Sequence, residues 1–129
     1  MGRPEPRADV CDRRLTPARR LTPALYLDTF GRGRSFPGRL LVLWLRIAPD
    51  AARLVGVVTS RRTLRTAVAR NRGRRLLRET FRLLRTHLRP DADVLLVARG
   101  RIGAAKRQAV DDDFRAVCRK AGIWSETPC

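Results

Sequence analysis

Residues 39–47 alternate between two kinds of side chain, which is the pattern of a strand with one buried face. The set that suits a core consists of Leu41, Leu43, Leu45 and Ile47. The other set consists of Val42, Trp44 and Arg46, so an aromatic ring and a guanidinium share the opposite face. The segment therefore predicts a strand that separates a hydrophobic core from a chemically distinct second surface.

Three further segments have strand patterns. Residues 34–36 precede a Pro37-Gly38 turn and predict a short strand. Residues 54–60 predict a strand antiparallel to 39–47, because the connection between them is short. Residues 93–99, DVLLVAR, form a continuous apolar run typical of an interior strand. A helical crossover leads to this run, so we expect it to lie parallel to the strand before it.

The longest helical pattern follows residue 70. One apolar stripe at helical spacing consists of Leu77, Phe81, Leu84 and Leu88. An adjoining stripe consists of Arg74, Arg78, Arg82 and Arg85, flanked by Arg75. Arg70 would fall among the apolar positions, so we expect the helix to begin near Asn71 and to end near His87, before Pro90. Arg70, Asn71 and Arg72 would then stand at its N-terminal end, where free backbone N–H groups attract phosphate.

Two more helices complete the predicted order. Thr22-Pro23 resembles an N-cap followed by proline at the first helical position, and Gly31 and Gly33 would end that short helix. Residues 106–121 predict a last helix with Val110, Phe114, Val117 and Cys118 inward. The order α-β-β-β-α-β-α predicts an α+β fold, a two-layer sandwich with a mixed sheet of about four strands and helices on one face.

The chain divides into three parts by composition. Residues 1–15 contain proline and charge without periodicity, and predict a disordered basic arm. Residues 16–122 predict a single RNA-binding α+β domain, and residues 123–129 form a C-terminal tail.

Charge points to a polyanionic partner. The 129 residues contain 29 Lys+Arg against 12 Asp+Glu, giving a net charge of +17. Seven of the arginines and one acid fall in residues 67–85, so helical pairing relieves little of their repulsion. Nucleic acid explains this better than a merely solvated face. We expect no membrane partner, because no apolar run approaches the roughly 20 residues of a spanning helix and no signal peptide is recognisable.

Residues suited to catalysis are few. His87 is the only histidine, and the acids Asp91, Asp93 and 111–113 suggest capping and solvation. The cysteines Cys11, Cys118 and Cys129 lack metal-ligand spacing and are typical of free thiols in a reducing cytosol. We therefore expect this chain to catalyse nothing by itself and to bind no metal alone. Tyr26, Phe30, Trp44 and Arg46 are candidates for a surface that stacks single-stranded nucleic acid, although Tyr26 and Phe30 also fit as ordinary core anchors.

Several ordered motifs resemble the protein subunit of bacterial ribonuclease P. They are Val55-Gly56, Ser60-Arg61-Arg62, the run AVARNRGRR at 67–75, Arg78-Glu79, Phe81-Arg82, Asp93-Val94 and Ala98-Arg99. Tyr26, Phe30 and Gly33 match an aromatic–aromatic–glycine spacing, and Trp44 falls where the family often has an aromatic strand residue. The chain departs from the family in a longer, glycine-free connection at 63–66 and in Gly73, where a β-branched residue is common.

The resemblance implies a function in tRNA processing. An RNA subunit, using Mg2+ that it binds mainly itself, would hydrolyse precursor tRNA endonucleolytically to release the 5′ leader. The residues implied to face the catalytic RNA are Arg70, Asn71, Arg72, Arg74, Arg75 and Arg78. Those implied to line the leader cleft, with Arg46 added from the strand pattern, are Tyr26, Phe30, Trp44, Arg46, Ser60 and Arg61. The protein would be a cytoplasmic, non-catalytic subunit whose partners are the ribonuclease P RNA subunit and precursor tRNA, with no obligate protein partner.

Two alternatives stay open from the residues alone. A structural RNA-binding protein, ribosome-associated or an RNA assembly factor, would share the arginine helix but need no aromatic groove. A binder of duplex DNA would show equal affinity for duplex DNA and structured RNA.

Overall fold

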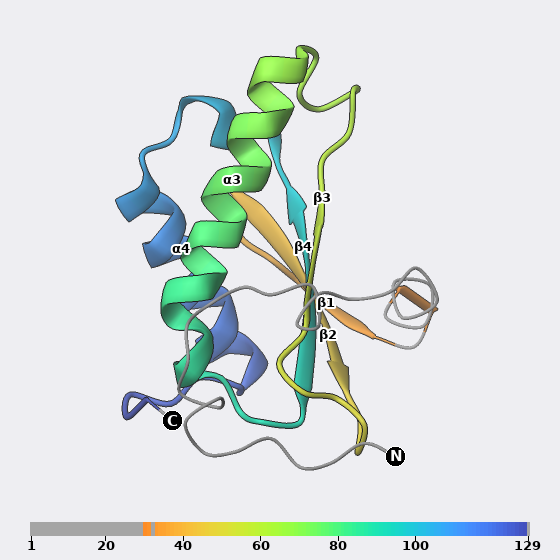
Figure 1. Cartoon of the computed structure of the whole chain (residues 1–129), viewed down its shortest axis with the longest axis vertical. Helices are drawn as coiled ribbons and strands as arrows, with labels where there is room; N and C mark the ends of the chain where they lie inside the picture. The colour runs from red at the N-terminus through yellow and green to blue at the C-terminus, as the bar shows by residue number, and fades with distance from the viewer. Residues whose placement is uncertain (1–29, 32, 129) are drawn as a thin grey trace.

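The computed structural model describes residues 30–31 and 33–128 (Figure 1). The expected basic arm, Tyr26 and almost all of the expected first helix lie outside these residues. No helix in the described part of the chain has both the length and the apolar character needed to cross a bilayer.

Four strands form one mixed sheet in the order β1-β2-β4-β3. The strands are β1 (Arg34–Pro37), β2 (Leu41–Ile47), β3 (Val55–Val58) and β4 (Ala92–Ala98). β4 lies between β2 and β3, antiparallel to β2 and parallel to β3. The parallel crossover from β3 to β4 and the antiparallel direction of β2 and β3 are both confirmed.

Two helices cover one face of this sheet (Figure 1). They are α3 (Ala67–Leu84) and α4 (Arg107–Ala121), each followed or preceded by a 3-10 turn, η2 (Arg85–His87) and η3 (Gly100–Ala104). The core lies between helices and sheet, and its largest side chains include Phe81 and Phe114, whose rings meet edge to face at 6.4 Å. The predicted two-layer α+β sandwich is therefore confirmed.

The alternation along β2 predicted its buried face correctly for all but one residue. Leu41, Leu43 and Leu45 are buried, whereas Val42, Trp44 and Arg46 lie on the other face. Ile47 is 48% exposed, so its expected place in the core is wrong. It is the last residue of β2, and the burial of this face of the strand ends at Leu45, although its partner Ala92 on β4 is buried.

Helix α3 begins a turn earlier than the periodicity indicated. Thr66 is its N-cap, and the Thr66 hydroxyl accepts a hydrogen bond from the Ala69 amide at 3.0 Å. Arg70 is therefore inside the helix, and not at its N-terminal end. Its guanidinium leaves the apolar stripe by turning back to donate to the carbonyls of Leu64 and Arg65.

Arg85 does not belong to the exposed arginine stripe. Helix α3 ends at Leu84, and the tighter η2 turn rotates the next side chains away from the helical pattern. Arg85 is 1% exposed and donates to the carbonyls of Arg53 and Ala52 at 3.1 and 3.0 Å. Backbone carbonyls thus bind this buried guanidinium, which sequence periodicity did not predict.

Three of the aspartates, Asp93, Asp111 and Asp113, are structural anchors, so their expected role in capping and solvation is wrong, whereas Asp91 and Asp112 keep exposed carboxylates. Asp93 is buried and accepts hydrogen bonds from the amides of Ala52 and Leu54 at 3.0 and 2.8 Å. The buried Asp111 of α4 accepts a hydrogen bond from the Thr80 hydroxyl of α3 at 2.6 Å. Each of these carboxylates joins two elements that are distant in the sequence.

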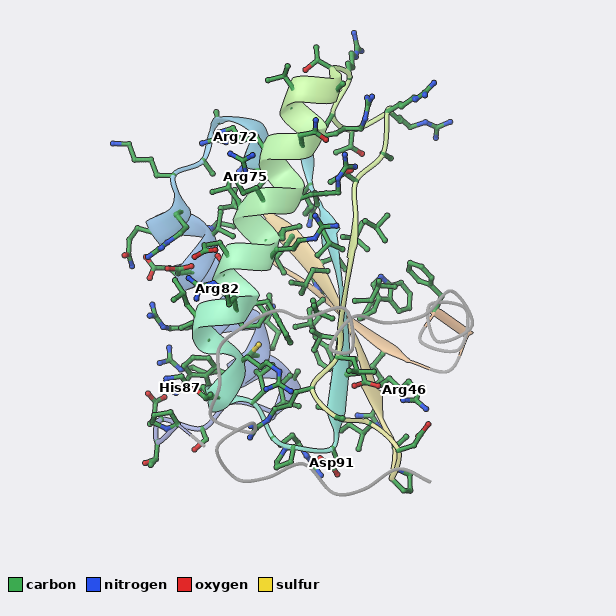
Figure 2. All side chains as sticks on the ribbon, viewed as in Figure 1. Arg46, Arg72, Arg75, Arg82, His87 and Asp91 are labelled. Atoms are coloured by element: carbon green, nitrogen blue, oxygen red, sulfur yellow. The ribbon has the colours of Figure 1, made fainter. Side chains whose placement is uncertain are left out.

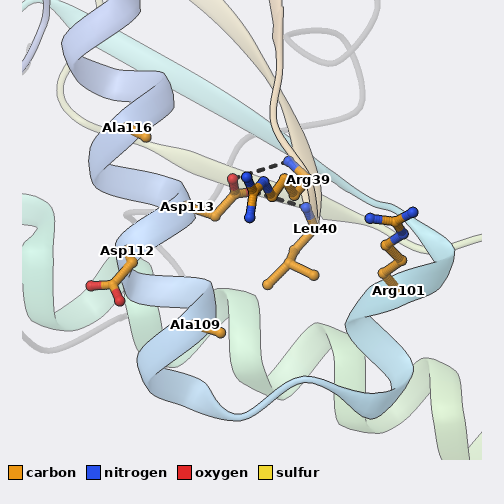
Figure 3. A pocket seen from close by; sticks show the side chains of 7 residues that line it. All are labelled: Arg39, Leu40, Arg101, Ala109, Asp112, Asp113 and Ala116. Atoms are coloured by element: carbon orange, nitrogen blue, oxygen red, sulfur yellow. Dashed lines mark hydrogen bonds between the residues drawn. The ribbon is translucent and has the colours of Figure 1, made fainter.

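Asp113 fastens α4 to the turn between β1 and β2 (Figure 3). Its carboxylate accepts hydrogen bonds from three successive amides, at 3.0, 2.9 and 3.3 Å, those of Arg39, Leu40 and Leu41. A Cβ at Gly38 would lie 2.5 Å from this carboxylate, so only glycine fits the turn in its present position.

We expect Asp113→Ala to lower the free energy of unfolding by about 1–3 kcal/mol, because it leaves buried or half-buried amides without their acceptor. Urea denaturation of the full chain measures this loss. Asp112→Ala is the matched control, because Asp112 is exposed and interacts only with Gln108 and Arg115 on its own helix. An equal loss for both variants would contradict the anchoring role.

Candidate nucleic-acid interface

Every acidic residue that the structure describes accepts a hydrogen bond from elsewhere in the protein. Six arginines outside the motif at 70–78 form the ion pairs, namely Arg46, Arg82, Arg89, Arg107, Arg115 and Arg119. Within the described residues, no carboxylate forms an ion pair with an arginine at positions 70–78. The arginines of this motif therefore keep their charge uncompensated.

Several exposed arginines for which the described residues offer no ion pair lie at one end of the sheet. β3 and β4 run parallel, so the residues that follow them, Arg61 and Arg99, emerge at the same end. The first residue of β2, Leu41, pairs with Ala98, which places Arg39 there as well. The opposite end contains Arg46 and Asp91, as Figure 2 shows. Arginines without an ion pair therefore cluster at the first end, whereas Arg46 at the other end has acidic partners.

Helix α3 presents an arginine face at this basic end. The Arg74 guanidinium donates to the Thr59 hydroxyl at 2.8 Å and to the side-chain amide oxygen of Asn71. Arg75 and Arg78 make no hydrogen bond or ion pair with any part of the chain that the structure describes. Asn71, Arg74, Arg75, Arg78 and Glu79 line one hollow on this face. Arg75 and Arg78, which have no intramolecular hydrogen bond among the described residues, thus lie beside Arg74, whose orientation is fixed.

Glu79 does not neutralise this face. Its carboxylate accepts hydrogen bonds from Arg82, and this contact holds the pKa of Glu79 below its ordinary value and raises that of Arg82. The pair is half exposed, so solvent reduces its contribution to stability. Glu79 stays ionised near neutral pH, but its charge is already matched by Arg82.

Arg72 has a structural role that its motif did not suggest. Its guanidinium donates to the carbonyls of Ile102 and Gly103 at 3.1 and 3.0 Å, and to that of Ala105. These carbonyls lie at the C-terminal end of η3, and that of Ile102 also accepts from the Ala105 amide at 3.2 Å. Arg72 thereby joins α3 to the loop that contains Arg101.

The open face of the sheet contains the described aromatic residues expected in the leader cleft. Trp44 projects from β2 on the face away from the helices, and Phe30 meets it edge to face at 5.1 Å. Phe30 is 40% exposed, so this ring is partly available to a ligand. Tyr26 lies outside the described residues. The structure brings Phe30 and Trp44 together as an aromatic platform.

Arg46 and Ser60 lie at opposite ends of the sheet. Arg46 pairs with Asp93 across β2 and β4, whereas Ser60 follows β3 beyond the pair Val58–Val97. Four residues of β4 separate these levels, which is about 13 Å along the strand. Arg46 also forms ion pairs with Asp93 and Asp50, both at 2.7 Å. Its expected neighbours in one cleft, Ser60 and Arg61, are therefore not its neighbours in the structure.

Ser60 and Arg61 form the start of the turn that leads to α3. The Ser60 hydroxyl accepts from the Thr63 amide at 3.1 Å and donates to the Thr63 hydroxyl at 2.9 Å. Arg61 is exposed. These hydrogen bonds order the connection before α3, which contains no glycine.

A second group of arginines was missed by the sequence analysis. Gly38, Arg39, Arg99, Gly100 and Arg101 line a hollow in which no acid takes part. The signal was present, because basic residues follow both β3 and β4, and the ends of parallel strands meet at one edge. It was missed because the arginine-rich helix dominated the charge pattern.

The described residues contain no group of three or more histidine, cysteine, aspartate or glutamate side chains that would hold a metal ion. Burial raises the pKa of the Cys118 thiol, which sits in the core against α3 and the sheet. His87 stacks on Trp124 at 4.5 Å and contacts the Ser125 carbonyl through Nδ1 at 2.7 Å. Both residues therefore contribute to the fold.

Solved structures and curated relatives agree with this architecture. The ribonuclease P protein of Staphylococcus aureus, in a mutant with defective mRNA degradation activity, superposes with a TM-score of 0.74 at 22% identity, covering 83% of this chain and 91% of that one. The Thermotoga maritima protein gives 0.67 at 22% identity, over 78% and 96%. The "Ribonuclease P protein component" of Syntrophomonas wolfei is 32% identical over 109 residues, 84% of this chain and 90% of the relative. That of an Exiguobacterium species is 33% identical over 97 residues, 75% and 83%.

The fold and its uncompensated arginine surface define a small α+β protein of the RNA-binding class. A profile of the family described as Ribonuclease P matches residues 16–122. The chain belongs to this family, as its sequence motifs indicated. It is accordingly a subunit of an endoribonuclease in which catalysis is RNA-based, and the RNA subunit is its partner.

We expect Arg72→Ala to lower the free energy of unfolding by about 1 kcal/mol, since it frees the carbonyls at the end of η3. Thermal unfolding and hydrogen exchange of residues 100–106 measure the effect, and exchange in this loop should accelerate. Arg75→Ala is the control and should change stability by less than about 0.5 kcal/mol. Unchanged loop exchange in Arg72→Ala would show that the three contacts do not order the loop.

Proposed function

We propose that this protein binds the ribonuclease P RNA through the arginine face of α3. We further propose that it holds the 5′ leader of precursor tRNA on the open face of the sheet. In this way it assists the RNA subunit in removing the leader endonucleolytically to give the mature tRNA 5′ end. The observation that carries the proposal is the presence of two distinct surfaces, an arginine face whose one acid, Glu79, is already paired with Arg82, and a separate aromatic platform.

The arginine face suits folded RNA for an electrostatic reason. Arg75 and Arg78 offer planar guanidinium groups that match phosphate oxygens with paired donors. Arg74 is already oriented by Thr59 and Asn71, which lowers the entropy lost when it meets a phosphate. The exposed part of Arg70 and the free donors of Arg72 extend this face toward the N-terminal end of α3.

The aromatic platform suits a single strand. Nucleobases stack on aromatic rings without regard to sequence, which fits leaders of varied sequence. Trp44 and Phe30 supply the rings, while Ser60 and Arg61 lie at the end of the sheet where the chain leads into the N-terminus of α3. In this proposal Arg46 stabilises the far edge of the sheet through Asp50 and Asp93 and does not touch the leader.

Phosphodiester hydrolysis in this proposal belongs to the RNA subunit, together with most of the Mg2+ it uses. The protein supplies positive charge and a surface for the substrate. It acts in the cytoplasm and requires no other protein.

The test is to add the full chain to a bacterial ribonuclease P RNA at low magnesium concentration and to measure cleavage of precursor tRNA. We expect the protein to increase the rate, because its arginines reduce the repulsion between the two RNAs. An unchanged rate with a correctly folded protein would refute the proposed role.

We expect Arg75→Ala and Arg78→Ala each to reduce the slope of log affinity against log salt by about 1, because each variant releases one counterion fewer. Binding of the full chain to ribonuclease P RNA between low and moderate salt gives this slope. Arg89→Ala is the matched control, since Arg89 pairs with Asp91 at the other end of the sheet. Parallel lines for Arg75→Ala, Arg78→Ala and the wild type would place these side chains away from phosphate.

Trp44→Ala should weaken binding of the holoenzyme to precursor tRNA by about 1–3 kcal/mol, the value of one stacked base. Binding of mature tRNA, which has no leader, should stay the same. Trp44→Phe keeps a ring on the platform and is the control, with a smaller loss. A similar loss for precursor and mature tRNA would contradict a leader-specific contact.

A further inference from the structure

Val68 is the most exposed large hydrophobic residue that the structure describes, at 78%. It lies in the first turn of α3, where a β-branched residue forms helix less readily than alanine. It makes no contribution to the core, which α3 contacts through Gly73, Leu77 and Phe81 on its other side. Neither helix formation nor packing accounts for a valine here.

The surroundings of Val68 form a hollow on the arginine helix. Its lining consists of Val68, Asn71, Arg72, Arg75 and Leu76. These residues follow Val68 by three, four, seven and eight positions, which is one continuous stripe on a helix. Figure 2 shows Arg72 and Arg75 close together on the N-terminal half of α3. The hollow thus combines two apolar side chains with two guanidinium groups and one amide.

Some hydrogen-bond donors that line the hollow have no partner among the described residues. The side-chain oxygen of Asn71 accepts a hydrogen bond from Arg74, so the two N–H donors of the same side-chain amide remain for another partner. Arg75 makes no hydrogen bond or ion pair with the described residues. Arg72 is fixed by the η3 carbonyls, so it forms a rigid side of the hollow. An occupant must therefore be apolar on one surface and accept hydrogen bonds at its edge.

We propose that this hollow binds one unpaired nucleobase of folded RNA. The ring would lie against Val68 and Leu76, its acceptor edge would meet the Asn71 amide, and Arg75 would take the adjoining phosphate. The inference rests on the proposed RNA-binding role of α3 and adds a base contact to it. Charge complementarity favours RNA as the occupant, because neither Arg72 nor Arg75 forms an ion pair with a described acid, and the nearby Glu79 is already paired with Arg82. An apolar protein surface would leave both cations uncompensated.

The experiment compares Val68→Ser with wild type in binding of the full chain to a bacterial ribonuclease P RNA across a range of salt concentrations. We expect about tenfold weaker binding at every salt concentration, with an unchanged slope, because an apolar contact releases no counterions. Val68→Leu keeps an apolar surface and should bind like wild type. Ile47→Ser removes another exposed apolar side chain, at the opposite end of the sheet, and should bind like wild type as well.

Chemical probing of the RNA with dimethyl sulfate gives a second readout. One unpaired base should be protected by wild type and Val68→Leu, and reactive again with Val68→Ser at saturating protein. Equal affinity of wild type and Val68→Ser, or a changed salt slope, would overturn the nucleobase site while leaving the arginine face intact. Failure of wild type itself to bind the RNA would instead overturn the proposed function.

Discussion

The scarcity of carboxylates is the constraint on which this structure depends. Three of the carboxylates, those of Asp93, Asp111 and Asp113, are placed at joints between elements, where each accepts hydrogen bonds from distant parts of the chain. The others pair with arginines outside the motif at 70–78. No described acid forms an ion pair with the arginines at 70–78 of α3. The same allocation therefore stabilises the fold and leaves the arginine face charged.

Helix α3 combines these two requirements along its length. Its inner stripe packs on the sheet through Leu77 and Phe81, while its outer face carries the arginines. Gly73 lies on the inner side, where an added Cβ would come within 3.1 Å of Leu64 and 3.5 Å of Ile102. Glycine in a helix costs about 1 kcal/mol relative to alanine. Here it allows the connection before α3 and the η3 turn to pack closely against the helix, which accounts for its presence in place of a larger residue.

The sequence predicted the elements well because their causes are local. Alternation along β2 and the apolar stripe of α3 depend on neighbouring residues, and both faces were assigned correctly apart from Ile47 at the strand end. The errors share a different cause. Arg70, Arg85 and Asp113 are all held by backbone groups, and the partners of Arg85 and Asp113 lie more than 30 positions away. Side-chain periodicity contains no information about such partners.

Because sequence patterns report only on neighbouring residues, they predicted one part of the candidate interface and missed another. The charge run in α3 could be recognised because its members are adjacent in sequence. The separation of Arg46 from Ser60 could not, because it depends on β4 entering between β2 and β3. The structural role of Arg72 likewise depends on η3 ending beside α3, which only the folded chain shows.

The uncompensated charge also links binding to stability. Arginines on one helix face repel one another, so the free protein is less stable than its packing alone would make it. Phosphates that bind this face remove the repulsion, and a ligand that binds only the folded state stabilises it further. The aromatic platform is uncharged and contributes no such repulsion, so the coupling is confined to α3. In the proposed role, the protein would therefore gain stability on binding RNA through the same residues that limit its stability when free, while the aromatic surface would stay unaltered.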